Sequence, residues 1–221
     1  MRFVPIAFLL LSLPNDVRGQ PSPQPPQDFM GRKVTVIEAE LDEDGFHPKG
    51  PASVCLEGPP LRQCYTAPKD FGRLSKVSVI QTGKQTSALL FSAGGGGVSG
   101  WMVHFALLQP APSGDELENL FFSDMNFPNQ NQYAFWTDSP LDGTPIFLIA
   151  KYVWGEDEGH YGPHRYIISV YSQGKLSSNA AYHLMDEYMT VRRYIDNEDI
   201  LAAEKQEILS RLERLNPGGQ Q

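Results

Sequence analysis

The segment 154–165 concentrates residue types that bind metal ions. It carries Asp157, Glu158, His160 and His164. Imidazole nitrogens and carboxylate oxygens are zinc ligands, and a nearby carboxylate can activate a metal-bound water in a hydrolase. A Gly-Pro pair between the two histidines prevents the helix that would place both on one face. The favoured interpretation is a polar hairpin loop, and the alternative is a zinc site formed by Asp157, His160 and His164.

A second acidic segment, 40–45, begins like a calcium-binding loop. Glu40, Asp42 and Asp44 place carboxylates at alternate positions, and Gly45 comes sixth. The twelfth position of such a loop is a bidentate glutamate, and in this chain it is Pro51. The pattern favours an acidic turn, with an irregular calcium site of weak affinity as the alternative.

Aromatic residues gather in the second half of the chain. Every tyrosine except Tyr65 lies between residues 133 and 194. Exposed rings stack on the C–H faces of sugars, while amides and carboxylates bond their hydroxyls. The alternative is core packing, because strands favour aromatic residues. The candidate ligand-binding residues are Trp136, Tyr152, Trp154 and Tyr161, with Asn131, Gln132 and Asp138 available for hydroxyl groups.

The glycine run Gly94–Gly97 superficially resembles a phosphate-binding loop. It lacks the Lys-Ser/Thr pair of such a loop, and we predict a flexible hairpin loop leading into a strand at Trp101. Ser99 is not in a GxSxG sequence, and the chain has no HExxH. No catalytic motif is recognised, which favours a non-enzyme.

Short runs of β-type residues, separated by turn residues, must position these groups. The runs are 34–39, 53–56, 63–66, 76–81, 87–92, 101–109, 132–137, 146–154 and 165–171. Some are apolar on both alternating faces, as in Ile146–Ile149, which is typical of central strands. The pattern predicts a mainly β fold, an antiparallel β-sandwich, with a barrel as the alternative.

The end of the chain changes character. Leu201, Ile208, Leu212 and Leu215 recur at helical spacing after an acidic start, which predicts one C-terminal amphipathic helix. We expect it to pack on the β domain; the alternative is a helix that mediates assembly with a partner. Before it, 182–194 predicts one or two further strands, with Met185, Tyr188, Met189 and Val191 as core contacts.

The first residues predict export. An apolar stretch, 3–13, follows Arg2 and has the length of a secretory signal rather than of a membrane span. We predict cleavage before Gln20. The expected organisation is a signal peptide at 1–19, a Pro/Gln-rich leader at 20–31, a β domain at 32–195, a helix at 196–215 and a tail at 216–221.

Cysteine spacing and charge limit the biochemical class. Cys55 and Cys64 flank a Gly-Pro-Pro segment, and in an exported chain such a pair predicts a disulfide. The formal net charge of −8 argues against nucleic acid as a partner. No membrane span is expected in the mature chain.

Together these features predict a secreted or periplasmic, non-catalytic binding or structural module that takes a carbohydrate or protein ligand and holds no cofactor. The alternative function is a metal-assisted hydrolase centred on 154–165, with zinc or calcium.

Overall fold

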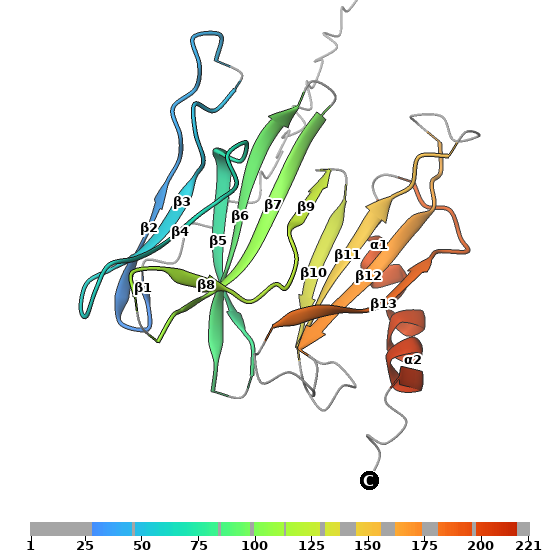
Figure 1. Ribbon diagram of the computed structural model, residues 1–221. Helices are drawn as coiled ribbons and strands as arrows, with labels where there is room; N and C mark the ends of the chain where they lie inside the picture. Colours follow the sequence, from blue (N-terminus) through green and yellow to red (C-terminus); the bar gives the residue numbers. More distant parts are fainter. Residues whose placement is uncertain are drawn as a thin grey trace, which may run out of the picture.

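The computed structural model describes residues 28–45, 47–83, 85–97, 100–112, 114–128, 131–137, 145–155, 162–173, 181–195 and 198–215. In these residues thirteen strands form three open antiparallel sheets, followed by two helices near the C-terminus (Figure 1). This confirms the prediction of a mainly β, sandwich-like fold. No described helix has the length and apolar character needed to cross a membrane.

Each sheet is built from strands that follow one another along the chain. The first sheet contains β1 (Asp28–Phe29), β2 (Arg32–Ile37), β3 (Ser53–Glu57) and β4 (Gln63–Thr66). The middle sheet contains β5 (Arg73–Gln81), β6 (Ser87–Gly97), β7 (Gly100–Pro110) and β8 (Leu117–Asn119), and β9 (Met125–Pro128) also pairs with β7. The third sheet contains β10 (Gln132–Trp136), β11 (Ile146–Tyr152), β12 (Tyr166–Gln173) and β13 (Tyr182–Met189).

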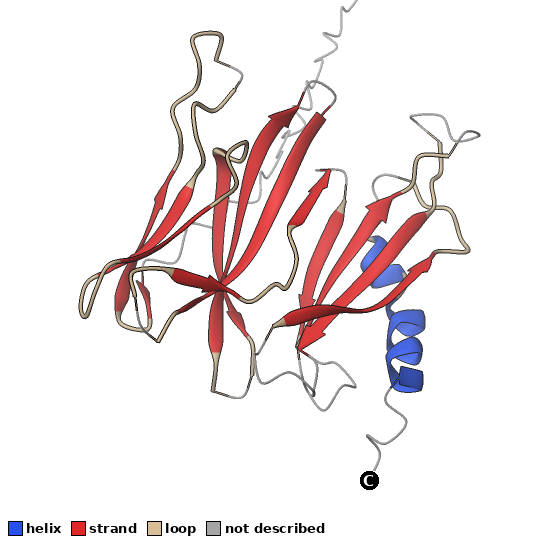
Figure 2. Cartoon of the chain, in the orientation of Figure 1, coloured by secondary structure: helices blue, strands red, loops and turns tan. Residues whose placement is uncertain are grey.

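The three sheets and the helices stack as successive layers, which Figure 2 shows from the side. One core lies between the first and middle sheets and contains Leu56 and Phe91. A second core, between the middle and third sheets, contains Leu90 and Phe147. A third core joins the other face of the third sheet to the helices and contains Ile146. Both faces of β11 and of residues 88–91 in β6 are therefore covered, which explains why these sequences are apolar at consecutive positions.

The helical segment is interrupted once. Helix α1 (Ile200–Ala203) begins at Asp199, whose carboxylate accepts a hydrogen bond from the Ala202 amide (2.9 Å), and Glu204 separates it from α2 (Lys205–Leu215). One helix was predicted and two consecutive short ones are present. Their apolar residues Ile200, Leu201, Ile208 and Leu212 all pack in the third core.

A bidentate ion pair fastens α2 to the outer strand of the third sheet. The Arg211 guanidinium donates to both carboxylate oxygens of Asp186 on β13, at 2.6 and 3.2 Å. The same guanidinium lies 4.4 Å from the centre of the Tyr188 ring. Arg211 therefore lowers the pKa of the Asp186 carboxyl, chiefly by hydrogen bonding to it.

Three predicted core contacts on the last strand are wrong. Met185 and Met189 are 37% and 45% exposed, and Val191, beyond the end of β13, is 98% exposed. The reason is that β13 is the outer strand of its sheet, so part of its surface has no neighbouring layer. Tyr188 does pack against the third core, as predicted.

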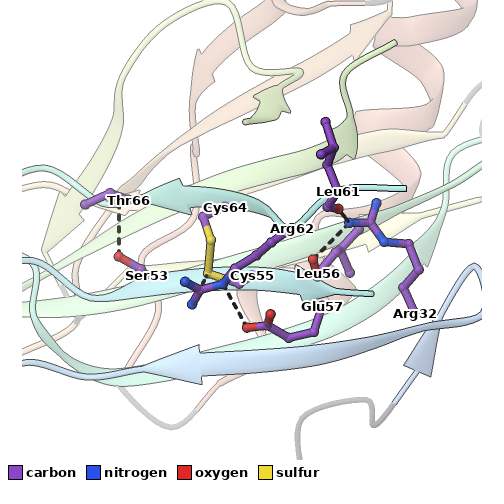
Figure 3. Close-up of a disulfide and its surroundings, with 9 residues drawn as sticks. All are labelled: Arg32, Ser53, Cys55, Leu56, Glu57, Leu61, Arg62, Cys64 and Thr66. Carbon is purple, nitrogen blue, oxygen red and sulfur yellow. Dashed lines mark hydrogen bonds and ion pairs between the residues drawn. A yellow bond between two sulfur atoms is a disulfide. The ribbon is translucent and has the colours of Figure 1, made fainter. Parts of the chain in front are cut away.

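The predicted pairing of Cys55 with Cys64 lies in the first sheet. The two residues face each other across β3 and β4, and their sulfur atoms are 2.12 Å apart, at disulfide-bonding distance (Figure 3). Arg62, in the connection between these strands, donates to Glu57 at 3.0 Å and points Nη2 at the Cys55 sulfur, 3.4 Å away. The crosslink thus closes the β3–β4 hairpin.

Candidate functional site

Trp136 lines a cleft between the outer strand β10 and the start of the helices. We call it the β10–α1 cleft; its volume is about 630 Å³. It brings together a residue from the predicted ligand-binding set and the two amides proposed for sugar hydroxyls. Its lining residues include Asn131, Gln132, Tyr133, Trp136, Glu198, Asp199 and Lys205.

Most polar groups of the β10–α1 cleft already hold the helix in place. The Gln132 side chain accepts from the Ile200 amide (2.9 Å) and donates to the Glu198 carbonyl (2.7 Å). Asp199 caps α1, and the Lys205 ammonium lies 5.1 Å from the centre of the Trp136 ring. A ligand would have to displace these contacts, so the polar groups of the cleft serve mainly to attach α1 to β10.

The other predicted aromatic residues form a separate cluster. Tyr152 is half-buried, and its ring lies 4.8 Å from that of Trp154 and 4.2 Å from that of His164. Trp154 is 55% exposed at the edge of this cluster. The structure does not align Trp136, Tyr152 and Trp154 as one row of exposed rings. Tyr161 and Asp138 lie outside the described residues.

Of the metal ligands predicted in segment 154–165, only His164 lies among the described residues. His164 is fully buried, and its Nε2 is hydrogen-bonded to the Tyr152 hydroxyl. Asp157, Glu158 and His160 lie outside the described residues. Within the parts of the chain that are described, no three His, Cys, Asp or Glu side chains converge as metal ligands. In segment 40–45, Asp42 accepts a hydrogen bond from the His47 amide at 3.2 Å, as in an acidic turn.

A groove on the middle sheet carries aromatic residues that the sequence interpretation did not select. We call it the Trp101 groove; its volume is about 360 Å³. It opens on the face of the middle sheet that also packs against the third sheet, and its lining includes Tyr133 of β10. The lining residues are Leu74, Lys76, Ser92, Gly94, Trp101, Met102, Val103 and Tyr133.

Strand register explains the shape of the Trp101 groove. Across β6 and β7, Gly94 pairs with Val103 and Gly96 pairs with Trp101, so no side chain stands opposite either larger residue. On the other side, Leu74 occupies an irregularity in β5 with a left-handed φ of 50°. A Cβ added to Gly94 would lie 3.4 Å from the Leu74 Cβ. Glycine therefore supplies the low floor between the Leu74 and Trp101 sides.

The apolar walls of the groove remain open to solvent. Leu74 is 63% exposed, Trp101 38% and Tyr133 44%. Tyr133 is anchored by its ring, which lies 4.5 Å from the ring of buried Phe105. Burial raises the pKa of the Tyr133 hydroxyl, so the hydroxyl is protonated at neutral pH and can both donate and accept a hydrogen bond.

Two polar side chains of the groove are unengaged. Ser92 is 6% exposed, yet its hydroxyl has no hydrogen-bond partner among the described residues. Lys76, opposite Ser92 in the register, is exposed and likewise makes no ion pair with a described residue. Compared with the β10–α1 cleft, the Trp101 groove therefore offers polar groups that a ligand can use without breaking internal bonds.

On the opposite face of the middle sheet, three buried or partly buried side chains are linked by hydrogen bonds. His104 donates from Nδ1 to Asn126 Oδ1 (2.6 Å) and accepts at Nε2 from the Tyr65 hydroxyl (2.8 Å). Burial lowers the pKa of His104 and, with the Asp124 carboxylate, raises that of Tyr65 to about 12. His104 is only 1% exposed, so these side chains link the first and middle sheets rather than meeting a substrate.

The signal that points to Trp101 is present in the sequence but was interpreted otherwise. The glycine run before Trp101 was predicted to be a flexible loop, whereas β6 continues through Gly97. Trp101 also stands apart from the aromatic cluster that begins at Tyr133.

Comparison with protein-family models, curated proteins and solved structures finds no match for this chain.

Proposed function

We propose that the protein is an exported, non-catalytic binding module that takes a carbohydrate in the Trp101 groove. The observation that carries the proposal is the pairing of exposed rings with unengaged polar groups: Trp101 and Tyr133 line the same groove as Ser92. At about 360 Å³ the groove falls within the ~300–1,000 Å³ typical of small-ligand sites.

A sugar suits this combination of surfaces. A pyranose ring presents an apolar C–H face, which stacks on an indole or phenol ring, and a rim of hydroxyl groups, which need hydrogen-bond partners. The Trp101 indole supplies the first surface, while the hydroxyls of Ser92 and Tyr133 supply partners for the rim. A protein ligand is the competing outcome of the test below.

The chemistry of the lining supports binding rather than turnover. Glycoside hydrolysis generally requires two carboxyl groups on either side of the scissile bond. The ionisable side chains among the described lining residues are Lys76 and Tyr133. These two groups can orient a ligand, and neither is a carboxylate that could attack it.

The chain has three tryptophans, and each occupies a different candidate location. Trp101 lines the groove, Trp136 lines the β10–α1 cleft, and Trp154 lies beside His164. The test is calorimetric titration of the wild-type protein and of Trp101→Ala, Trp136→Ala and Trp154→Ala against a panel of neutral and acidic oligosaccharides. Circular dichroism confirms that each variant is folded.

We expect at least a tenfold loss of sugar affinity in Trp101→Ala, because a stacking ring at the centre of a site contributes roughly 1.4 kcal/mol or more. Trp154→Ala should bind like the wild type. A loss confined to Trp136→Ala or Trp154→Ala would assign the site to another location. Failure of the wild type to bind any sugar in the panel would refute the proposal and favour a protein ligand.

A further inference from the structure

Lys76 contributes a positive charge to the lining of the Trp101 groove. It sits directly across from Ser92, and the next residue in that row, on β7, is Phe105. Phe105 is buried and contacts the ring of Tyr133. In the strand register Lys76 therefore shares the Ser92 end of the groove, while Trp101 lies four positions along β7 from Phe105, on the same face.

The positive charge of Lys76 is not neutralised by the described residues. No acidic side chain is among the groove's lining residues, and Lys76 forms no ion pair with a described residue. Arg73, on the same strand, differs in this respect because its guanidinium lies 3.7 Å from the Glu38 carboxylate. Lys76 is thus the cation that remains available to a ligand in the groove.

Ser92 provides the second, independent indication. Its hydroxyl makes no hydrogen bond to a described residue, yet it is not one of the fully enclosed polar atoms that lack a partner, so it opens onto the groove. Only 6% of the Ser92 residue is exposed, and Ser92 lines the groove. A ligand oxygen placed there would accept from Ser92 and from the Lys76 ammonium together. An ionised oxygen suits this position best, since hydrogen bonds to charged groups are the stronger ones.

We infer that the groove selects oligosaccharides that carry a carboxylate, with the C–H face of one sugar ring on Trp101 and the carboxylate of another between Lys76 and Ser92. This inference rests on the proposed function. It holds despite the net charge of −8, because solvent ions screen distant charges beyond about 8 Å at physiological ionic strength, whereas Lys76 acts at contact distance. Long polyanions, which would extend over the acidic surface, are disfavoured relative to short acidic oligosaccharides.

The experiment compares acidic sugars with neutral derivatives of the same sugars. Trigalacturonic acid and its trimethyl ester form one pair, and a hyaluronan tetrasaccharide and its carboxyl-reduced form make another. Each is titrated into wild type, Lys76→Gln, Ser92→Ala and the control Lys33→Gln. Lys33 is an exposed lysine on β2, in the first sheet, so its replacement makes the same change of charge away from the groove.

We expect wild type to bind the acidic member of at least one pair roughly tenfold more tightly than its neutral counterpart, as one charge-assisted hydrogen bond implies. Lys76→Gln should abolish that preference, so that the acidic sugar binds no more tightly than its neutral counterpart. Ser92→Ala should reduce the preference, and Lys33→Gln should retain it. Raising the salt concentration should weaken acidic-sugar binding in wild type more than in Lys76→Gln.

Failure of the acidic-sugar inference and failure of the proposed carbohydrate function give different results. Equal affinity for both members of every pair, with a loss in Trp101→Ala, would retain the carbohydrate site and overturn the choice of acidic sugars. A preference for the acidic sugar that survives in Lys76→Gln would also overturn it. If no sugar binds the wild type, the carbohydrate function itself is wrong, and the inference falls with it.

Discussion

At the scale of single residues, the second core, between the middle and third sheets, contains a hydroxyl in an unfavourable position. Tyr182 is 1% exposed, and its hydroxyl has no hydrogen-bond partner among the described residues. Its ring packs against Phe121 and Phe135. Burial accordingly raises the pKa of this hydroxyl well above its usual range. Tyr182 thus behaves as a phenylalanine that carries an additional desolvation cost.

Replacing Tyr182 by phenylalanine should stabilise the protein. The substitution keeps the ring and removes the unpaired hydroxyl, so we expect a gain of about 1 kcal/mol in the free energy of unfolding. The matched control is Tyr188→Phe, which removes a hydroxyl that donates to Glu204 at 3.0 Å and should lower stability. Urea denaturation of both variants measures the two effects. A destabilised Tyr182→Phe protein would mean that this hydroxyl has a partner.

The buried His104 should make stability depend on pH. Because its pKa in the folded protein lies below the ordinary value of 6.5, the unfolded chain takes up the proton first as the pH falls. The stability that neutral His104 contributes to the folded protein is fully present above pH 6.5. It is lost as the pH falls from 6.5 through the folded-state pKa of His104. Protonation of Nε2 would also remove the acceptor for the Tyr65 hydroxyl.

The measurement is the free energy of unfolding between pH 7.5 and 5 for wild type and His104→Gln. We expect the wild type to lose more stability over this range than the variant. Asp186 and Glu187 have pKa values lowered by Arg211 and Lys151 respectively, but both remain in the variant, so they cancel in the comparison. Parallel curves for the two proteins would show that His104 keeps an unshifted pKa.

At the scale of elements, helix α2 is a fourth layer rather than an appendage. Ile208 and Leu212 are fully buried in the third core, beneath which lie Leu148 and Ile168 of the third sheet. Leu215, one turn further on, is 52% exposed. Most of the apolar stripe therefore faces the chain's own sheet, as in an ordinary amphipathic surface helix.

Truncating the two leucines of α2 should have unequal effects. We expect Leu212→Ala to lower the free energy of unfolding by about 3 kcal/mol, because it removes buried methyl groups and leaves a cavity. Leu215→Ala should change it by less than about 0.5 kcal/mol. Thermal or urea unfolding measures both. Equal, small effects would contradict the packing of α2 and support a helix that is used for assembly.

At the scale of the whole molecule, the predicted export and the cysteine pair support one another. Structural disulfides persist in oxidising compartments and are rare in the cytosol. The Cys55–Cys64 crosslink closes a loop with a sequence separation of 9, for which a chain-entropy model gives roughly 3 kcal/mol of stabilisation. Export to an oxidising compartment would provide the conditions in which this crosslink forms and persists.

Expression of the full chain in a secreting host tests this combination. We expect the protein outside the cytoplasm, with a mass that corresponds to residues 20–221 and to two oxidised cysteines. Intact-mass spectrometry before and after reduction measures both properties in one sample. Retention of Met1 in the recovered protein, or free thiols on both cysteines, would count against the prediction.

The sequence by itself determined the features that depend on neighbouring positions. Alternating apolar residues indicate strands, and the recurrence of Leu201, Ile208 and Leu212 indicates a C-terminal helix, since both patterns follow from local backbone geometry. The short separation of Cys55 and Cys64 indicated their pairing for the same reason. Even the apolar character of both faces of Ile146–Ile149 correctly marked a central strand.

Only the tertiary structure decided which of these side chains are available to a ligand. Tyr152 and Trp101 both lie in aromatic-rich strands, yet one packs beside His164 and the other lines an open groove. The groove joins residues from β5, β6, β7 and β10, which are far apart in the chain. Exposure depends on where one sheet ends above another, and this stacking of layers is a long-range property that no local spacing encodes.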